Sequence, residues 1–250
     1  MTKSSMSRRR FLQSSGAAAL WLPTTVKGYT ANEIQALYVD GEMQENVSKF
    51  ELDTPALCVD LDLLEANIAT MQASTRSNGI ASRPHAKTHK TPVIAQMQLD
   101  SGSIGICTAK VSEAEAMYQN GIDEILMTTT NVTPTKIRRA MNLRQNCPGF
   151  VQATDSPQNA RLLSEAAMAM GINADVVVDV DPGGHRTGIT PRQPALELAQ
   201  LINQLPALNL RGLLCYDGGS QHVKGFEQRK NQTLERLVAA TETYDLFNQS

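Results

Sequence analysis

The residues best suited to chemistry in this sequence form a basic segment, residues 83–90, which reads Arg-Pro-His-Ala-Lys-Thr-His-Lys. It closes a predicted β-strand at residues 81–87, and barrel enzymes build their active sites at the carboxyl ends of their strands. A lysine on such a rigid element, partly withdrawn from water, can form a Schiff base with a carbonyl compound. Lys87 is therefore a candidate catalytic residue. Taken alone, a solvated basic cluster at a strand end explains the same residues.

Two later segments also place polar side chains after predicted strands. Residues 179–188 read Asp-Val-Asp-Pro-Gly-Gly-His-Arg-Thr-Gly, and their Arg186 is a planar, permanently charged donor suited to an oxyanion. Residues 212–222 read Gly-Leu-Leu-Cys-Tyr-Asp-Gly-Gly-Ser-Gln-His and contribute Tyr216 and His222. The alternatives are a glycine turn with a surface arginine in the first segment and a structural histidine in the second.

The histidines of the basic segment have a spacing that on a helix would indicate zinc. His85 and His89 are related as i and i+4. At the end of a strand these positions lie roughly 13 Å apart. We therefore predict no metal site from this pair.

Composition limits the classes of function. The chain has 250 residues, 41% of them apolar and 19% charged, with a formal net charge of −2. This is enough apolar material for one sizeable core. No stripe of Lys and Arg follows the N-terminal segment, so we expect small-molecule substrates and no nucleic acid.

An alternation of strands and helices must position these residues. The predicted strands are residues 56–59, 81–87, 104–109, 124–128, 150–154, 174–180 and 210–216. The predicted helices are residues 92–99, 112–120, 134–143, 157–170, 191–204 and 228–246, with an earlier one capped by Asp60 or Asp62. This order predicts an α/β fold with parallel strands and right-handed crossovers. A (β/α)8 barrel of the TIM type and an open doubly wound sheet both fit, although no GxGxxG follows the first strand.

Several of these segments together carry a family resemblance. Thr-Pro-Ala at residues 54–56, the basic segment, and Gly-Ile-Cys-Thr-Ala-Lys-Val-Ser-Glu-Ala-Glu at residues 105–115 closely resemble the D-threonine aldolase and D-serine dehydratase family. These are fold-type III pyridoxal phosphate (PLP) enzymes, which share their N-terminal barrel with alanine racemase. Residues 179–188 match the family's strand followed by GxxRxG, and residues 212–222 match its strand ending in YxGxxQH. The resemblance covers residues 49–249.

The resemblance implies a cofactor and the residues that bind it. Lys87 would hold PLP, and Lys90 would be a second, unbonded lysine on the following helix. Arg186 would donate a hydrogen bond to the phenolic oxygen of the cofactor, Tyr216 would lie near the pyridine ring, and Thr108 would line the pocket.

The resemblance also implies a reaction. It is that of a PLP-dependent lyase on β-hydroxy-D-amino acids, with His222 on the substrate side and Lys87 or His222 as the base. Retro-aldol cleavage to glycine and an aldehyde is favoured slightly over dehydration. A non-catalytic PLP-binding carrier, a racemase and an inactive truncated member of the family are the alternatives.

The strand count predicts an incomplete barrel. Six strands follow the first segment, whereas a TIM-type barrel has eight. We therefore expect a barrel truncated after about six strands, without the family's C-terminal β domain. In full-length relatives that region carries phosphate-binding loops and a His-x-Asp or His-x-Cys pair for a divalent metal, so we expect no metal ligands here. The resemblance further implies a homodimer and a D-amino acid substrate.

The N-terminal residues resemble a twin-arginine export signal. Residues 7–13 read Ser-Arg-Arg-Arg-Phe-Leu-Gln, and a short apolar run follows at residues 17–22. This run is much shorter than the ~20 residues that span a bilayer, so we expect no stable membrane anchor. We predict a signal or disordered segment over residues 1–30, the PLP barrel over residues 31–250, and export to the periplasm. A basic disordered tail is the alternative.

Overall fold

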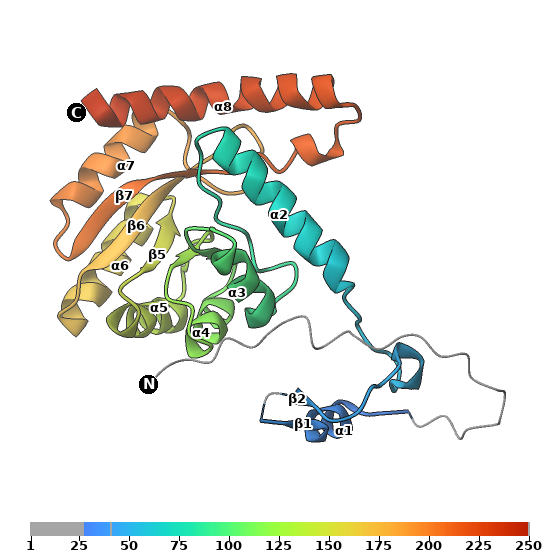
Figure 1. Ribbon diagram of the computed structural model, residues 1–250. Coiled ribbons are helices and arrows are strands. Elements are labelled where there is room, and N and C mark those ends of the chain that lie inside the picture. The colour runs from blue at the N-terminus through green and yellow to red at the C-terminus, as the bar shows by residue number, and fades with distance from the viewer. Residues whose placement is uncertain (1–27, 41, 250) are drawn as a thin grey trace, which may run out of the picture. The chain divides into compact units, whose positions relative to one another are not determined.

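The computed structural model describes residues 28–40 and 42–249 (Figure 1). The export signal predicted over residues 1–30 lies almost wholly outside them. The chain divides into two compact units, Met1–Ala66 and Asn67–Ser250. The boundary between these units lies inside α2 (Leu61–Ser77).

The described part of the first unit contains short elements before α2 begins. They are α1 (Ala31–Ala36), β1 (Tyr38–Val39), β2 (Glu42–Met43) and the 3-10 helix η2 (Lys49–Glu51), with β1 and β2 antiparallel. The strand predicted at residues 56–59 is wrong: these residues pair with no strand, and Leu57 is fully exposed. Four apolar residues do not make a strand unless a neighbouring strand takes up their backbone hydrogen bonds. As expected, Asp60 caps α2, accepting a hydrogen bond from the Leu63 amide at 3.1 Å.

The second unit is built on a parallel sheet. Its strands are β3 (Ile106–Thr108), β4 (Ile125–Met127), β5 (Phe150–Thr154), β6 (Ala174–Val180) and β7 (Leu208–Cys215), paired in that order. Strands that neighbour one another in chain order are typical of a (β/α) barrel, whereas a doubly wound sheet reverses its order at a switch point. The predicted α/β fold with parallel strands is confirmed, with five of the predicted strands in the sheet.

The strand predicted at residues 81–87 is wrong in extent. It forms one bridge, between His85 and Cys107, in which the Ala86 amide donates to the Cys107 carbonyl at 2.8 Å. Pro84 has no amide hydrogen and accepts from the Cys107 amide instead, at 2.7 Å. The segment therefore touches the edge of β3 without extending the sheet as a regular strand.

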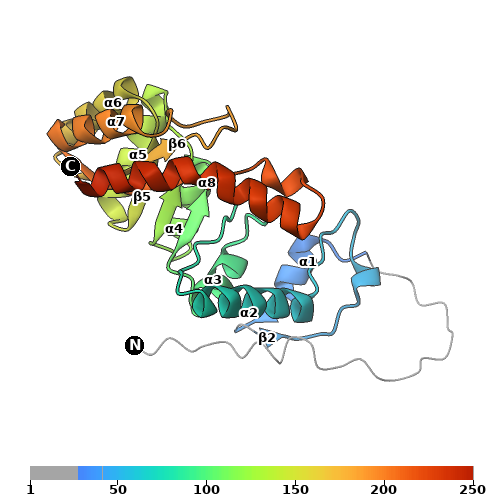
Figure 2. The same cartoon turned by 90° about the horizontal axis from the view of Figure 1, so that it is seen from above.

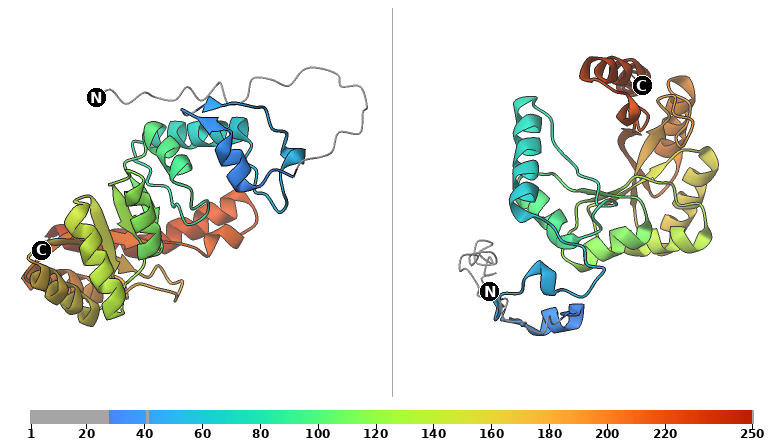
Figure 3. Two further views of the ribbon diagram at one scale, coloured as in Figure 1. Left: turned by 90° about the horizontal axis from the view of Figure 1, so that it is seen from below. Right: turned by 90° about the vertical axis from the view of Figure 1, so that its right-hand side faces the viewer.

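Helices connect the strands and cover one face of the sheet (Figures 2 and 3). They are α3 (Pro92–Asp100), α4 (Val111–Gln119), α5 (Pro134–Asn146), α6 (Pro157–Met170), α7 (Gln193–Gln204) and α8 (Phe226–Gln249). Thr133 and Ser156 cap α5 and α6, each just before a first-turn proline. α7 begins two residues later than predicted because Arg192 has a φ of 67°, which is incompatible with a helix. No helix in residues 28–40 and 42–249 is long and apolar enough to cross a membrane.

Side-chain alternation gives the sheet two different faces. On one face, Ile106, Ile125 and Phe150 join the side chains of α4–α7 in the hydrophobic core. The opposite face, here called the site face, carries the residues between them, which include Cys107 on β3 and Asp179 on β6. The residues that directly follow each strand continue the same alternation. Their position in it therefore determines which of their side chains lie on the site face.

Candidate active site

Three of the predicted site residues meet at the carboxyl ends of the strands. The Nζ atom of Lys87 lies 5.4 Å from the centre of the Tyr216 ring, and the guanidinium carbon of Arg186 lies 5.1 Å from it. Lys87 comes from the turn before α3, Arg186 from the loop after β6, and Tyr216 follows β7 directly. Both distances are within the range of cation–π attraction. Lys87 and Arg186 therefore both lie beside the Tyr216 ring.

The charges of this group identify the ligand chemistry that it suits. Within the described part of the chain, neither Lys87 nor Arg186 forms a salt bridge. Two cations beside one aromatic ring are complementary to a planar anion. The lysine amine can add to an aldehyde, and the guanidinium can donate to an oxyanion. These donors fit PLP, with Lys87 for its aldehyde and Arg186 for its phenolic oxygen.

Asp179 is a site-face residue that sequence reasoning missed. It is 4% exposed near the end of β6 and is in register with Leu214 of β7, two residues before Tyr216. Burial raises the pKa of its carboxyl to about 6, while a hydrogen bond from Thr187 and the charge of Arg186 lower it. The available signal was an acidic residue inside an apolar strand, a position that acidic side chains rarely take without a reason.

His85 contacts Lys87 directly. Its Nδ1 atom accepts a hydrogen bond from the Lys87 amide at 3.3 Å, and its Nε2 atom lies 3.1 Å from the Thr128 hydroxyl oxygen. Burial lowers the pKa of His85 to about 4, and the charge of Lys87 lowers it further, against the charge of Glu113 and a hydrogen bond with the Cys107 backbone, which raise it. The ring is therefore neutral at ordinary pH, and its two nitrogens have different partners.

The geometry expected for the histidine pair and for Lys90 is wrong. Residues 86–90 form a turn, closed by a 2.7 Å hydrogen bond from the Lys90 amide to the Ala86 carbonyl. Lys90 has a φ of 50° and precedes α3, so it is not on the following helix. His89 accepts from the Thr91 amide at 3.0 Å, away from the partners of His85. Among residues 28–40 and 42–249, no three His, Cys, Asp or Glu side chains are arranged to hold a metal ion.

Side-chain alternation distinguishes Thr108 from Thr128. Thr108 is fully buried on the same face of β3 as Ile106, and its hydroxyl has no hydrogen-bond partner. Thr128 follows Met127, a core residue of β4, and so lies on the site face, where it meets His85. The hydroxyl beside the site is thus that of Thr128, and Thr108 contributes its carbonyl, which accepts from the Thr128 hydroxyl at 3.2 Å.

The position of the Tyr216 ring depends on a glycine. A Cβ atom on Gly218 would lie 2.7 Å from Tyr216 Cε1 and 3.3 Å from Cζ. The ring therefore packs directly over the Gly218 backbone. This contact gives a physical reason for the glycine of the Tyr-Asp-Gly sequence.

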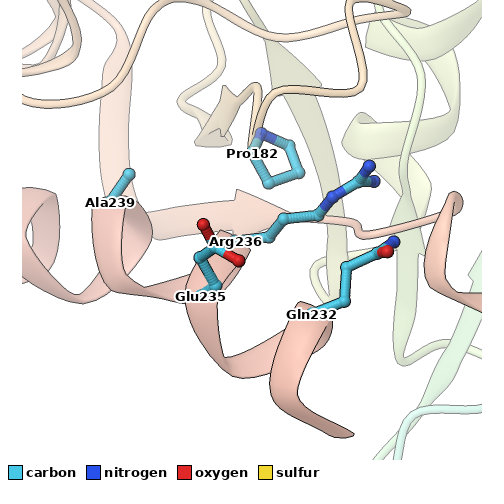
Figure 4. A pocket seen from close by; sticks show the side chains of 5 residues that line it. All are labelled: Pro182, Gln232, Glu235, Arg236 and Ala239. Atoms are coloured by element: carbon cyan, nitrogen blue, oxygen red, sulfur yellow. The ribbon is translucent and has the colours of Figure 1, made fainter. Parts of the chain in front are cut away.

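α8 holds the loop that follows Tyr216. The buried Asp217 carboxylate accepts from Arg236 Nη1 at 2.8 Å and from the amides of Gly219 and Ser220 at 3.2 and 3.3 Å. Figure 4 shows the Arg236 side chain between Pro182 and Gln232, in a pocket at the carboxyl ends of β6 and β7. The lining residues of this pocket are Pro182, Gln232, Glu235, Arg236 and Ala239.

His222 does not join the three residues that meet. It ends the 3-10 helix η3 (Ser220–His222) and is exposed, with its Nε2 atom 3.5 Å from the side-chain nitrogen of Gln221. In the part of the chain that the structure describes, it makes no hydrogen bond to Lys87, Arg186 or Tyr216.

Comparisons with known proteins show the family of the chain. The family description "Alanine racemase, N-terminal domain" matches residues 59–248. A D-threonine aldolase from Arthrobacter sp is 39% identical over 199 residues, which are 80% of this chain and 52% of that protein. A 3-hydroxy-D-aspartate aldolase from Paracoccus denitrificans (strain Pd 1222) is 35% identical over 196 residues, which are 78% of this chain and 51% of that protein. The chain spans about half the length of the curated relatives it matches.

Solved structures give the same result. The crystal structure of D-threonine aldolase from Filomicrobium marinum matches with a TM-score of 0.77 and 37% identity, over 80% of this chain and 54% of that one. D-threo-3-hydroxyaspartate dehydratase from Delftia sp. HT23 matches with a TM-score of 0.73 and 27% identity, over 79% of this chain and 52% of that one. The described sheet and its helices are therefore of the same kind as the matched half of these enzymes.

Proposed function

The chain belongs to the family of the alanine racemase N-terminal domain, and on that premise we propose that it acts as a PLP-dependent lyase on β-hydroxy-D-amino acids through Lys87. The observation that carries the proposal is the meeting of Lys87 and Arg186 on the Tyr216 ring. The names of several relatives support the substrate class. D-threonine, D-serine, 3-hydroxy-D-aspartate and D-threo-3-hydroxyaspartate all carry a hydroxyl on the β-carbon.

Each residue of the group has a defined task in this proposal. When bound, PLP supplies an electron sink for the charge that develops at the α-carbon of the substrate. Lys87 would hold the cofactor at its aldehyde, and the Nζ atom of Lys87 would accept the proton that leaves the substrate. Arg186 donates to the phenolic oxygen, and Tyr216 orients the two cations by its ring face. We assign the base to Lys87 in preference to His222, because in the described part of the chain His222 makes no hydrogen bond to Lys87, Arg186 or Tyr216.

Among the lyase reactions, we propose retro-aldol cleavage. Identity is 39% with the D-threonine aldolase and 35% with the 3-hydroxy-D-aspartate aldolase, against 32% with a D-threo-3-hydroxyaspartate dehydratase from Delftia sp. (strain HT23) and 25% with an alanine racemase from Desulfosudis oleivorans. In the cleavage, Lys87 would accept the proton of the β-hydroxyl. In a dehydration it would accept the proton of the α-carbon.

One observation favours a second candidate, PLP binding without turnover. Lys87 is exposed, and the exposed fraction of Tyr216 is 48%. Electrostatic interactions with a reacting substrate are strongest where water is excluded. A site this open suits cofactor binding more readily than catalysis by these residues alone.

The test begins with PLP binding. Purified protein and the Lys87→Ala and Lys136→Ala variants are mixed with PLP, reduced with borohydride and mapped by peptide mass. We expect the label on Lys87 in wild type and in Lys136→Ala, whose substitution lies on the exposed surface of α5. Labelling scattered over surface lysines, or unchanged labelling in Lys87→Ala, would reject the proposal.

The products then separate the reactions. D-threonine, D-serine and 3-hydroxy-D-aspartate are each incubated with the PLP-loaded protein. Glycine together with an aldehyde indicates the aldolase, and ammonia together with a keto acid indicates a dehydratase. Selective Lys87 labelling without either product indicates the cofactor-binding alternative.

We also propose that the protein is exported in its folded form. The support is the Ser-Arg-Arg-Arg-Phe-Leu-Gln sequence at residues 7–13. A route that carries folded proteins suits an enzyme whose cofactor is inserted in the cytoplasm. Expressed in its natural setting, the wild-type chain should be found in the periplasm, whereas Arg8→Lys combined with Arg9→Lys should retain it in the cytoplasm. If the wild-type chain and the double variant were found in the same proportions in the periplasm and the cytoplasm, this proposal would be overturned.

The resemblance further supports a homodimer as the oligomeric state. Light scattering of the purified chain at several concentrations measures its molar mass directly. A mass of twice 27.2 kDa supports the dimer, and a monomer at all concentrations contradicts it.

A further inference from the structure

We propose that His85 is a positioning residue that fixes the backbone of the cofactor lysine through a hydrogen-bond chain of defined direction. The chain starts at the Lys87 amide and passes through the imidazole to Thr128. It ends at the Thr108 carbonyl of β3. The inference rests on the proposed function only for the assignment of Lys87 as the cofactor lysine.

The direction of the chain follows from its two ends. The Lys87 amide can only donate, so the Nδ1 atom of His85 carries no proton. The Thr108 carbonyl can only accept, so the single hydroxyl hydrogen of Thr128 is directed to it at 3.2 Å. The Thr128 oxygen must then accept from His85, across the 3.1 Å contact with Nε2. Only the neutral imidazole with its proton on Nε2 satisfies all three contacts.

The charges around the ring keep it in this form. Burial lowers the pKa of His85 to about 4, and the charge of Lys87 acts in the same direction, whereas the charge of Glu113 and a hydrogen bond with the Cys107 backbone oppose it. A proton on Nδ1 would also face the amide hydrogen of Lys87 and break that hydrogen bond. His85 is therefore unsuited to acid–base catalysis, and its contribution is geometric.

The backbone around Lys87 has few other restraints. The residue is exposed and lies in a turn closed by one hydrogen bond, from the Lys90 amide to the Ala86 carbonyl. The His85 ring connects this turn to the end of β4, while the backbone of the segment is bridged to β3 at Cys107. The imidazole thereby determines where the flexible lysine side chain starts relative to the Tyr216 ring.

The first test examines the wild-type protein without cofactor. Nitrogen-15 NMR of the histidine rings, with the His85 signal assigned from a His85→Gln sample, reports the tautomer and its titration. We expect the neutral form protonated on Nε2, unchanged from pH 8 to pH 5.5. A proton on Nδ1, or a titration midpoint above pH 6, would overturn the inference even if PLP binds to Lys87.

The second test uses two replacements that each keep half of the ring's contacts. The side-chain oxygen of Asn can replace Nδ1 and accept from the Lys87 amide, whereas Gln can reach Thr128 and leaves that amide unpaired. The readout is the rate of borohydride-trapped labelling of Lys87 by PLP. We expect His85→Gln to slow labelling by about fivefold, because it leaves the Lys87 amide unpaired, and His85→Asn by about twofold or less, because it keeps that hydrogen bond.

His89→Gln is the matched control, because His89 lies in the same turn but accepts from the Thr91 amide. It should label within about twofold of the wild-type rate. Equal rates for His85→Gln and wild type, or a greater loss in His85→Asn than in His85→Gln, would overturn the inference. Failure of wild type to label Lys87 would instead reject the proposed function, and the NMR tautomer would still decide the hydrogen-bond chain.

Discussion

The Nζ atom of Lys87 lies 5.4 Å from the centre of the Tyr216 ring, although the two residues belong to opposite ends of the strand series. If the ring face orients the amine, Tyr216→Phe should preserve the rate at which PLP labels Lys87. Tyr216→Leu removes the π face and should slow labelling about two- to fivefold, because a cation–π contact at an exposed site is worth about 0.5–1 kcal/mol. Equal rates for Phe and Leu would show that the ring does not act on Lys87.

Arg186 is expected to decide the affinity for PLP. Replacing the guanidinium by a neutral amide in Arg186→Gln removes a charged donor, and hydrogen bonds to charged groups are worth about 1.5–3 kcal/mol. The dissociation constant for PLP, measured by absorbance titration, should rise at least about tenfold. Arg161→Gln makes the same change of charge on the exposed surface of α6 and should leave the constant unaltered. If both variants raised the dissociation constant to a similar extent, Arg186 would affect PLP binding only through the net charge of the protein.

Gly218→Ala tests whether the packing of Tyr216 on the loop matters. The new Cβ atom would lie 2.7 Å from Tyr216 Cε1, so the ring must move. We expect the dissociation constant for PLP to rise severalfold. Gly184→Ala is the matched control, since its Cβ atom would meet only Asp181 Oδ1, at an ordinary 3.8 Å, and its φ is not positive. Unchanged PLP affinity in Gly218→Ala would show that the ring position is unimportant for the cofactor.

The strands and helices with strong local signals were predictable from sequence. β5 (Phe150–Thr154), β6 (Ala174–Val180) and α6 (Pro157–Met170) have the predicted bounds, because apolar runs or a capped proline define their ends. The segment at residues 81–87 and the run at residues 56–59 were mispredicted. Whether such a run forms a strand depends on a partner elsewhere in the chain, and local composition does not report it.

The site residues show the same division. Lys87, Arg186 and Tyr216 were found through motifs, and the structure brings them together, but sequence reasoning chose Thr108 where the geometry favours Thr128. A change of one residue in a strand reverses the face on which a side chain lies. The register of β3 against β4 had to be known before the two threonines could be distinguished.

The ion pair between Arg236 and Asp217 should stabilise the fold. Arg236→Gln leaves a buried carboxylate without its cation, and we expect the free energy of unfolding to fall by about 1–3 kcal/mol, below the full cost of a deeply buried pair because Arg236 is partly exposed. Burial raises the pKa of Asp217, but hydrogen bonds from Ser220 and Arg236 lower it below its ordinary value. The contribution is therefore present at neutral pH and is lost as the carboxylate is protonated in acid.

Urea unfolding at pH 7 measures this loss. Adding Asp217→Asn to Arg236→Gln should recover part of it, because no unpaired charge remains buried. If the double variant is less stable than Arg236→Gln by the full effect of Asp217→Asn alone, the two residues are not coupled.

Asp179 should make stability depend on pH in the opposite sense. Because burial raises its pKa to about 6, the folded protein binds a proton that the unfolded chain, with a carboxyl pKa of about 4, has already released. Stability from this group is present below pH 4 and is lost as pH rises through 6. Asp179→Asn removes the ionised form. Relative to wild type, it should therefore gain about 1–2 kcal/mol between pH 4.5 and pH 8.

Urea unfolding of both proteins at the two pH values gives this difference, with Asp245→Asn on the exposed surface of α8 as the control. The comparison between pH values cancels any constant loss of packing or of the hydrogen bond from Thr187. Asp179→Asn therefore reports ionisation alone. A difference from wild type that is the same at pH 4.5 and pH 8 would mean that the carboxyl of Asp179 ionises in the folded protein as easily as in the unfolded chain.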